Sequence, residues 1–514
     1  MGVSNDRKFS GQFVSELLNN AIGKTLGQID EMGSHQFLRT ESNSKITGIA
    51  GDVIEQSLFR YKRDSLQECD IEIDGLLTEL KTTGIRIPKS ELKIAKSSSP
   101  DNYSLYYKAK EGISITRVTL EPTIQTDFLT SHFWQKAERL LLVFYEYKSY
   151  DVVPASEYKD FLLVGWFINK FSESEKNQLR GDWEIVRDYL LPYYQEDEPE
   201  TRRLKLQGFT HILRPKLLLL ELVPGYKRKP NGSYQSPRYR LKKTFVDYLV
   251  KGYFDKTRTS QEISLAKSFS SFHELDERCH EISIQYAGKT LTQLKNIFNL
   301  TENISTKNFG AICIIHMFGA QCSRLNQICD FTKAGIIAKT ITLTDSGNKT
   351  EDMKLSKIDF GEWADRDIDF EDSLIYNYFC EHSFLCPIFC ESEKDNPTKT
   401  QFLGFKRFAF DDEFIEDEVK KTWKDSRHLI HSNSLKWEFE YDRAGNPVKN
   451  KSGSFKGAPN FPKSKDYNVF FRGGANDSSE EARTESVNGI KMLPQFFWLS
   501  GTYISEKLKS LPYL

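Results

Sequence analysis

Residues 70–83 carry acidic and basic side chains at a spacing that could support metal-assisted hydrolysis. In Asp70-Ile-Glu-Ile-Asp-Gly-Leu-Leu-Thr-Glu-Leu-Lys-Thr-Thr83, isoleucine alternates with acid up to Asp74-Gly75, and a β-favouring run follows. This pattern predicts a β-hairpin with a tight turn at Asp74-Gly75. Alternation along the second strand places Glu79 and Lys81 on one face, ~7 Å apart.

Two carboxylates and a lysine that converge on one point have a specific chemical use. Carboxylate oxygens suit Mg²⁺, which keeps several waters and binds through one or two carboxylates together with a substrate phosphate. Lys81 would orient or deprotonate the attacking water and offset developing charge. The first carboxylate is either Asp70 or Glu72, and the sequence pattern leaves both open.

The neighbourhood of the hairpin distinguishes it from a solvated Glu-x-Lys surface strand. Residues 48–59 have apolar side chains at helical spacing and place Glu55 just upstream. Residues 131–136 lead into an apolar strand at 140–145. A second copy, Glu91-Leu-Lys93, follows a proline with no hairpin before it, and we expect it to lie in a loop.

These motifs together resemble a known nuclease family. Gly48-x-x-Gly51-(x)₃-Glu55 on a helix, followed by Asp70 and then Glu-Leu-Lys-Thr, is similar to the MutH mismatch-repair nuclease. It is more similar to the Sau-type restriction endonucleases that cut GATC, which resemble two MutH copies in one chain and belong to the PD-(D/E)xK nucleases. The resemblance implies a mixed α/β fold and an active site made of Glu55, Asp70, Glu79, Lys81 and Lys136, with Asp70, Glu79 and Glu55 on the metal.

One spacing departs from the family pattern. The family usually has seven positions from the aspartate to the glutamate, whereas Asp70 and Glu79 are nine apart here. Either the hairpin carries two extra residues after Gly75, or Glu72 replaces Asp70.

Composition limits the class of protein. The chain has 514 residues, of which 39% are hydrophobic and 28% charged, which is typical of a globular protein with two or more domains. It has no run of eighteen apolar residues and no apolar signal core after Met1, so we expect a soluble, cytoplasmic protein with no membrane partner. None of the eight cysteines forms a Cys-x-x-Cys pair, which favours reduced thiols.

The net charge of −1 does not indicate a DNA partner, but two local basic stretches do. Residues 226–243 hold seven basic residues, three tyrosines and no acid, and residues 443–465 are also basic and free of acid. Lysine and arginine neutralise phosphates, so both stretches predict contacts with double-stranded DNA. The candidate DNA-binding residues are Lys227, Arg228, Lys229, Arg214, Arg238, Arg240, Lys242, Lys449, Lys451, Lys456 and Arg472.

An internal repeat predicts two similar α/β domains, residues 1–260 and 261–514. Six short segments recur in the same order, among them Gly23-Lys-Thr-Leu-Gly-Gln28, which returns as Gly288-Lys-Thr-Leu-Thr-Gln293. A shared Cys-Asp pair aligns Asp330 with Asp70, which favours Asp70 over Glu72 as the metal ligand. The degenerate second site is then Asp330, Ile337 in place of Glu79, and Lys339 in place of Lys81, with Glu381 opposite Lys136.

A site with isoleucine in place of a carboxylate cannot hold Mg²⁺ well, so the second domain should bind DNA without cutting it. The sequence thus predicts a pseudo-dimeric, Mg²⁺-dependent type II restriction endonuclease, a monomer or a transient dimer on DNA. The resemblance implies cutting at GATC with 5′-phosphate ends. The alternatives are a methyl-directed nicking nuclease and a DNA-binding protein on a dead nuclease fold.

Overall fold

The computed structural model describes the chain with several gaps. The described residues are 7–30, 37, 48–61, 68–149, 153–194, 208–223, 236–255, 265, 267–348, 351–366, 368–393, 396–450, 453, 455–475, 477 and 479–514. None of the helices within these ranges combines the length and the apolar character needed to cross a membrane.

The chain divides into two compact units, and we describe each by itself. The first comprises Met1–Leu275 with Cys329–Gly335, and the second comprises Asp276–Ile328 with Ile336–Leu514. Helix α15 (Cys329–Lys333), which the repeat assigned to the second domain, therefore belongs to the first unit.

The predicted hairpin is confirmed as strands β2 (Ile71–Ile73) and β3 (Leu76–Arg86), which pair antiparallel. Asp74 and Gly75 have φ values of 53° and 78°, which is the backbone that a two-residue type I′ turn requires. The Asp74 carboxylate also accepts a hydrogen bond of 2.8 Å from the N–H of Gly11, the first residue of helix α1 (Gly11–Asn19). The turn is thus fixed both by its own residues and by the rest of the unit.

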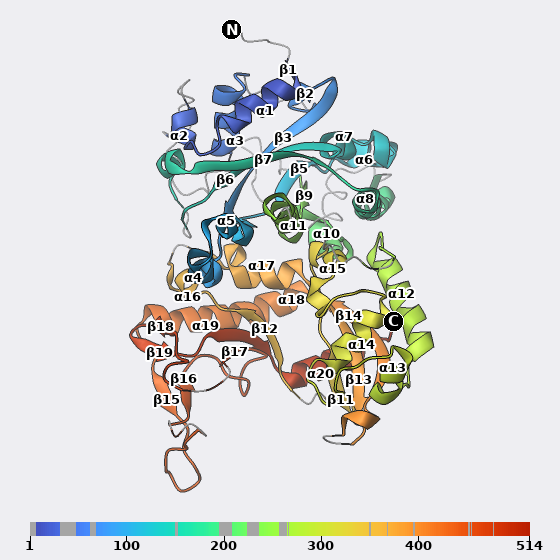
Figure 1. Cartoon of the computed structure of the whole chain (residues 1–514), viewed down its shortest axis with the longest axis vertical. Helices are drawn as coiled ribbons and strands as arrows, with labels where there is room; N and C mark the ends of the chain where they lie inside the picture. Colours follow the sequence, from blue (N-terminus) through green and yellow to red (C-terminus); the bar gives the residue numbers. More distant parts are fainter. Residues whose placement is uncertain are drawn as a thin grey trace. The chain divides into compact units, whose positions relative to one another are not determined.

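The main sheet of the first unit is mixed. Its order is β1-β2-β3-β6-β7, with β4 paired to the end of β3. Strand β3 runs parallel to β6 (Arg139–Glu146), and β6 runs antiparallel to β7 (Leu162–Lys170). Residues 140–144 of β6 are fully buried, as expected for a central strand covered on both faces. Figure 1 shows β3, β6 and β7 together in this unit, with α1, α2 and α3 near one another.

A second sheet completes the first unit. Its order is β5-β9-β8, formed by β5 (Ile113–Arg117), β9 (Arg238–Leu241) and β8 (Leu220–Val223). The carboxylate of Asp182, on helix α8 (Glu173–Tyr194), is buried and accepts the N–H groups of Leu218, Leu219 and Leu220 at 2.6–2.8 Å. One aspartate therefore ties α8 to the start of β8.

The second unit repeats this order of strand pairing. Strands β10 (Ile336–Ala338) and β11 (Ile341–Thr344) both run parallel to β13 (Ser383–Glu391), which runs antiparallel to β14 (Gln401–Ala409). A three-stranded sheet β12-β20-β17 accompanies it, as β5-β9-β8 does in the first unit. β15 and β16 form a two-stranded ribbon that extends from the rest of this unit (Figure 1).

The Gly-Lys-Thr-Leu-x-Gln motif has one structure in both units. Thr25 and Thr290 each cap a helix, α2 (Leu26–Ile29) and α13 (Leu291–Ile297), through a reciprocal capping box with the glutamine three residues later. Gly23 and Gly288 have φ values of 81° and 78°, so the motif is a turn beside a helix.

The remaining helices and strands either belong to these sheets or connect them. In chain order they are β1 (Lys8–Phe9), α3 (Ile49–Val53), η2 (Ile54–Leu58), α4 (Lys89–Ser97), α5 (Pro100–Tyr103), η3 (Ser104–Tyr106), β4 (Lys108–Ala109), α6 (Leu120–Gln125), η4 (Phe128–Thr130), α7 (His132–Ala137), η5 (Ala155–Asp160), α10 (Phe209–Leu213), η6 (Arg214–Lys216), α11 (Lys243–Phe254), α12 (Phe272–Tyr286), α14 (Phe309–Met317), η8 (Leu325–Gln327), β12 (Met353–Lys357), α16 (Phe360–Ala364), η9 (Phe370–Asp372), α17 (Leu374–Glu381), η10 (Pro397–Lys399), α18 (Asp412–Phe414), η11 (Ile415–Val419), α19 (Lys420–His431), β15 (Trp437–Phe439), β16 (Gly457–Pro459), β17 (Val469–Gly473), β18 (Glu485–Val487), β19 (Ile490–Met492), β20 (Gln495–Leu499) and α20 (Gly501–Ser510).

The prediction of a loop at Glu91-Leu-Lys93 is wrong. These residues lie in helix α4, which begins directly after Pro88. Glu91 sits in the first turn, where the helix dipole favours an acid, and its carboxylate pairs with Lys108 at 2.6 Å. Pro88 is itself the N-cap residue, with φ −54° and ψ 140°, so it lies outside the helix and does not interrupt its hydrogen bonds.

The role of Asp182 predicts a large loss of stability on substitution. We expect Asp182→Asn to lower the free energy of unfolding by about 2–4 kcal/mol, because the amide group cannot accept all three buried N–H groups. Asp188→Asn is the control, since Asp188 lies on the same helix with its side chain 62% exposed and should change stability by less than about 0.5 kcal/mol. Denaturant unfolding of the full chain measures both, and equal effects would contradict this assignment.

Candidate active site

The hairpin register brings Asp70 and Glu79 together. Ile71 pairs with Thr78, so continuing the pairing by one residue sets Asp70 directly opposite Glu79, where side chains lie about 4.5–5.5 Å apart at Cβ. The N–H of Leu80 donates to Asp70 Oδ2 at 2.9 Å. With a two-residue turn at Asp74-Gly75, the residue opposite Asp70 is the one nine positions later, which is Glu79.

Glu72, the other candidate for the first carboxylate, lies elsewhere. It pairs with Leu77 across the hairpin. Its carboxylate lies 3.4 Å from the ammonium of Lys8, and the Lys8 side chain is largely exposed. Asp70, and not Glu72, is thus the acid beside Glu79.

Glu79 is the buried centre of the site, with 1% of its surface exposed. Lys81 Nζ donates to Glu79 Oε1 at 2.6 Å. Lys136 Nζ donates to both carboxylate oxygens, at 3.1 Å to Oε1 and 3.0 Å to Oε2. Lys136 comes from helix α7, whose first turn is capped by the Ser131 hydroxyl. Strand β3 and helix α7 therefore meet at one carboxylate.

The charges of the site influence one another strongly. Burial raises the pKa of Asp70, and the charge of Glu79 raises it further, while Lys81 and Lys136 act in the opposite direction. Burial disfavours the charged form of Lys81, but the carboxylates of Glu79, Asp70 and Glu55 outweigh that effect and raise its pKa. Lys81 is therefore a charged ammonium in this state.

Glu55 lies at the edge of this cluster. Helix α3 begins after Gly48, whose φ of 86° favours glycine, and it continues as the π-helical turn η2 that carries Glu55. A Cβ on Gly51 would lie 3.5 Å from Thr82 Oγ1 and 4.0 Å from Glu55 Oε1, so the helix approaches β3 closely here. Within the described ranges, however, no three acidic, histidine or cysteine side chains are arranged to hold a metal ion. Glu55 therefore does not complete a three-carboxylate set.

The donor atoms of Asp70 and Glu79 fit a divalent cation. An ionised carboxylate offers about four acceptor positions, and the two lysines occupy three of those on Glu79. Asp70 Oδ1 accepts no hydrogen bond within the part of the chain that the structure describes, since only Oδ2 is used. Hard oxygen ligands of this kind suit Mg²⁺, and a cation between the carboxylates would remove the repulsion that raises the pKa of Asp70.

The structure separates the predicted DNA-binding residues into different environments. Lys227, Arg228, Lys229 and Lys451 lie outside the described residues. Arg238 and Lys449 are exposed, and Arg214 lies in η6. Arg240 is paired with Glu221 at 2.7 Å, and exposed Lys456 is paired with Glu440 at 2.8 Å.

The prediction that Lys242 contacts DNA is wrong. Its side chain is buried, with 4% exposed, and its Nζ donates to the carbonyl of Leu217 at 2.5 Å. Burial raises the pKa of the Asp182 carboxyl to about 6, and the N–H of Leu218 and the charge of Lys242 act in the opposite direction. Lys242 therefore supports the β5-β9-β8 sheet of the first unit.

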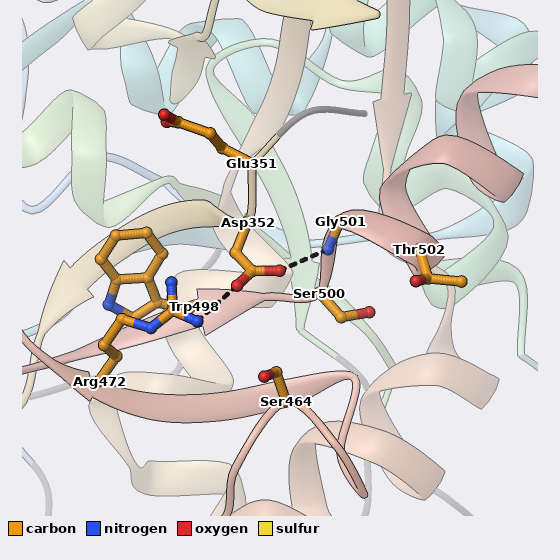
Figure 2. A pocket seen from close by; sticks show the side chains of 8 residues that line it. All are labelled: Glu351, Asp352, Ser464, Arg472, Trp498, Ser500, Gly501 and Thr502. Atoms are coloured by element: carbon orange, nitrogen blue, oxygen red, sulfur yellow. Dashed lines mark hydrogen bonds and ion pairs between the residues drawn. The ribbon is translucent and has the colours of Figure 1, made fainter. Parts of the chain in front are cut away.

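Arg472 lines a pocket of about 620 Å³ in the second unit (Figure 2). Its Nη2 donates to Asp352 at 2.6 Å, and its guanidinium lies 4.8 Å from the ring centroid of Trp498. The Asp352 carboxylate also accepts the N–H of Gly501 at the start of helix α20. In the aligned strand registers of the two units, Val223 occupies the position of Arg472.

The degenerate second site is only partly as predicted. Ile337 pairs with Phe384 on β13 as Glu79 pairs with Leu140 on β6, and Lys339 follows two residues later as Lys81 does. Lys339 is paired with no carboxylate in the described ranges, and burial together with nearby Lys354 lowers its pKa.

Asp330 does not take part in that site. It lies in helix α15 of the first unit, where it is buried and accepts the N–H of Leu265 at 2.9 Å. Its carboxylate lies 3.6 Å from Lys333. The alignment of Asp330 with Asp70 through a shared Cys-Asp pair is therefore wrong.

The proposed match of Lys136 with Glu381 also fails. Ser373 caps α17 as Ser131 caps α7, and counting from these caps places Tyr378 at the position of Lys136. Glu381 instead lies three residues further along, at the end of α17. Tyr378 carries no ammonium group, so the second unit also lacks the lysine that holds Glu79.

Sequence reasoning missed Tyr61. This tyrosine is buried, and burial, followed by the charges of Glu55 and Asp70, raises its pKa. The only local signal was its position six residues after Glu55 at the end of an apolar helical segment, which does not distinguish it from an ordinary core residue.

Comparisons with known proteins agree with this geometry. A family model described as DNA mismatch repair enzyme MutH matches residues 59–182, the segment that contains the hairpin, α7 and β6. The mixed sheet and the Asp70–Glu79 hairpin are consistent with a MutH-like nuclease fold. The chain is also 24% identical to the Type II restriction enzyme Sau3AI of Staphylococcus aureus, over 97% of this chain and 98% of that protein. The chain is thus similar to MutH over the segment that carries the hairpin, and to a Sau-type restriction endonuclease over nearly its whole length.

Glu79 and Glu72 allow a matched test of the site. We expect Glu79→Gln to lower the free energy of unfolding by about 3 kcal/mol, because buried Lys136 then lacks a counter-charge. Glu72→Gln makes the same change on the same hairpin at a partly exposed ion pair and should cost less than about 0.5 kcal/mol. Denaturant unfolding without divalent cations measures both variants. A Glu79→Gln protein as stable as wild type would show that the carboxylate does not hold the two lysines.

Proposed function

We propose that the chain is a Mg²⁺-dependent type II restriction endonuclease that cuts double-stranded DNA at GATC and leaves 5′-phosphates. The observation that supports this most is the convergence of Asp70, Glu79, Lys81 and Lys136 at one edge of a mixed sheet. The similarity to Sau3AI over nearly the whole chain supports restriction activity, and the GATC site is what the family resemblance implies.

The residues of the site have separable roles in this proposal. Asp70 and Glu79 would bind the cation, which when bound supplies Lewis-acid stabilisation of a phosphodiester. The charged ammonium of Lys81 would orient the attacking water and offset charge that develops on the phosphate. Lys136 would hold the Glu79 carboxylate in place and add positive charge, and Glu55 would help to keep Lys81 protonated.

The second unit would bind DNA without cutting it, as half of a pseudo-dimer. It carries Ile337 where the first unit has Glu79, and it repeats the strand pairing of the first unit. A two-fold DNA site is read well by two similar protein surfaces. Exposed Lys449 and Arg238 remain candidates for phosphate contacts.

Two other functions predict different products. A methyl-directed nicking nuclease would leave one strand intact, and a DNA-binding protein on a dead nuclease fold would shift DNA without cutting. The repeated strand pairing argues against the first, and the intact Asp70–Glu79 pair argues against the second.

A plasmid assay separates the three functions. With Mg²⁺ we expect wild type to linearise a plasmid with one GATC site and to leave a plasmid without that site intact. Asp70→Asn, Glu79→Gln and Lys81→Met should each lower the single-turnover rate by about 10³-fold, which corresponds to about 4 kcal/mol of lost transition-state stabilisation. Glu72→Gln should cut at the wild-type rate. Undiminished cutting by Glu79→Gln, or ends that carry 3′-phosphates, would contradict the proposal.

The raised pKa of Asp70 predicts an acid limit on activity. Only the carboxylate form binds a cation, and its pKa lies above the ordinary 3.8 because of burial and the neighbouring charge of Glu79. The cleavage rate should therefore fall as the pH drops through this raised pKa, at a higher pH than an ordinary aspartate would give. More Mg²⁺ should move the limit to lower pH, because the cation competes with the proton.

Single-turnover rates measured against pH at two Mg²⁺ concentrations test this prediction. DNA binding in Ca²⁺ over the same pH range is the control for loss of substrate affinity. A rate that stays constant down to about pH 4, or a limit that Mg²⁺ does not move, would show that Asp70 is not the titrating cation ligand.

A further inference from the structure

Tyr61 is a buried tyrosine whose hydroxyl group has no hydrogen-bond partner among the described residues. The residue is 7% exposed, and its hydroxyl oxygen makes no hydrogen bond in the described part of the chain. Its N–H donates to the carbonyl of Glu55 at 3.1 Å, so Tyr61 follows directly on the π-helical turn that carries Glu55. A buried hydroxyl loses its bonds to water, so one without a partner in a native structure requires an explanation.

The surroundings of this hydroxyl are acidic. Burial raises the pKa of Tyr61, and the carboxylates of Glu55, Asp70 and Glu79 raise it further, against a smaller opposite effect of Arg7. The phenol is therefore protonated and available as a hydrogen-bond donor within a cluster of carboxylates. The charges that act on this phenol thus include those of the two carboxylates that we assign to the cation, Asp70 and Glu79.

The ring of Tyr61 is held without help from its hydroxyl. The guanidinium of Arg7 lies 4.9 Å from the ring centroid, and the ring of Phe59 lies 6.5 Å away. Tyr61 also belongs to the apolar core of the first unit, together with Ile54 and Ile71. A phenylalanine would make these contacts equally well, so packing does not account for the hydroxyl.

We propose that the Tyr61 hydroxyl bonds a water molecule that enters with the divalent cation at Asp70 and Glu79, which makes Tyr61 a positioning residue. A water molecule there would satisfy the buried hydroxyl and would itself be oriented between the phenol and the carboxylates. The inference rests on the proposed nuclease function for its catalytic readout, but cation binding tests it independently.

The test compares Tyr61→Phe with Tyr145→Phe. Tyr145 is a buried tyrosine in the same core, and its pKa is raised by burial and then by Tyr158, Glu111 and Tyr147, none of which belongs to the site. Without divalent cations, Tyr61→Phe should unfold at or above the wild-type temperature, because it removes a group that makes no bond in that state. Its Ca²⁺ affinity, measured by calorimetry without DNA, should fall about 10-fold.

The catalytic readout follows from the same variants. With Mg²⁺, Tyr61→Phe should lower the single-turnover cleavage rate about 10–100-fold with unchanged DNA affinity, whereas Tyr145→Phe should leave both unchanged. A lower unfolding temperature with wild-type Ca²⁺ affinity would assign Tyr61 to the core and overturn the proposal, as would the absence of Ca²⁺ binding by wild type. If wild type binds Ca²⁺ but cuts no DNA, the nuclease proposal fails, while the calorimetry still decides the role of Tyr61.

Discussion

The buried carboxylate of Glu79, held between two ammonium groups, is the interaction on which the arrangement of the first unit depends. Removing a charge from water is costly, and here Lys81 and Lys136 compensate it with short bonds. Lys81 comes from the same strand as Glu79, but Lys136 comes from a helix that ends where β6 begins. The ion cluster therefore fixes α7 against β3 and sets the edge of the sheet where the chemistry is proposed.

This cluster would also keep the proposed cation-binding carboxylates in place before a cation binds. Glu79 has one acceptor position left, on Oε2, and Asp70 contributes a free Oδ1 within the described residues. Burial raises the pKa of Asp70 and the charge of Glu79 raises it further, while the two lysines partly offset both effects. Binding of a divalent cation would relieve the repulsion between the two carboxylates, so cation affinity follows from the same charges that stabilise the fold.

The sequence predicted the hairpin and its chemistry because those features depend on local patterns. Isoleucine alternation and Asp74-Gly75 determine the strands and the turn, and a two-residue turn then sets Asp70 opposite Glu79. The nine-residue spacing departs from the family pattern. It follows directly from the regular register of β2 and β3 around their two-residue turn. Lys136 was expected from the family resemblance, and the structure places it at the Glu79 carboxylate.

The wrong or missed predictions concern residues whose environment depends on segments that are distant in the sequence. Lys242 lies in a basic stretch, but its side chain turns inward to the carbonyl of Leu217, and no sequence pattern distinguishes it from an exposed lysine. Asp330 follows a cysteine as Asp70 does, yet a helix carries it into the first unit. Tyr61 packs as an ordinary core aromatic residue does. It differs only in its hydroxyl, which makes no hydrogen bond among the described residues.

The contrast between the two units indicates that the proposed metal site would depend on two paired strands and not on one side chain. The second unit keeps the register of β3 and β6 in β10 and β13, and it keeps Lys339 at the position of Lys81. In the described residues, however, β10 pairs only with β13, whereas β3 also pairs with β2. No hairpin partner therefore presents an acid opposite Ile337, and no lysine stands where Lys136 does. A glutamate at position 337 would be a buried charge beside one lysine, without the second carboxylate that a hard cation requires.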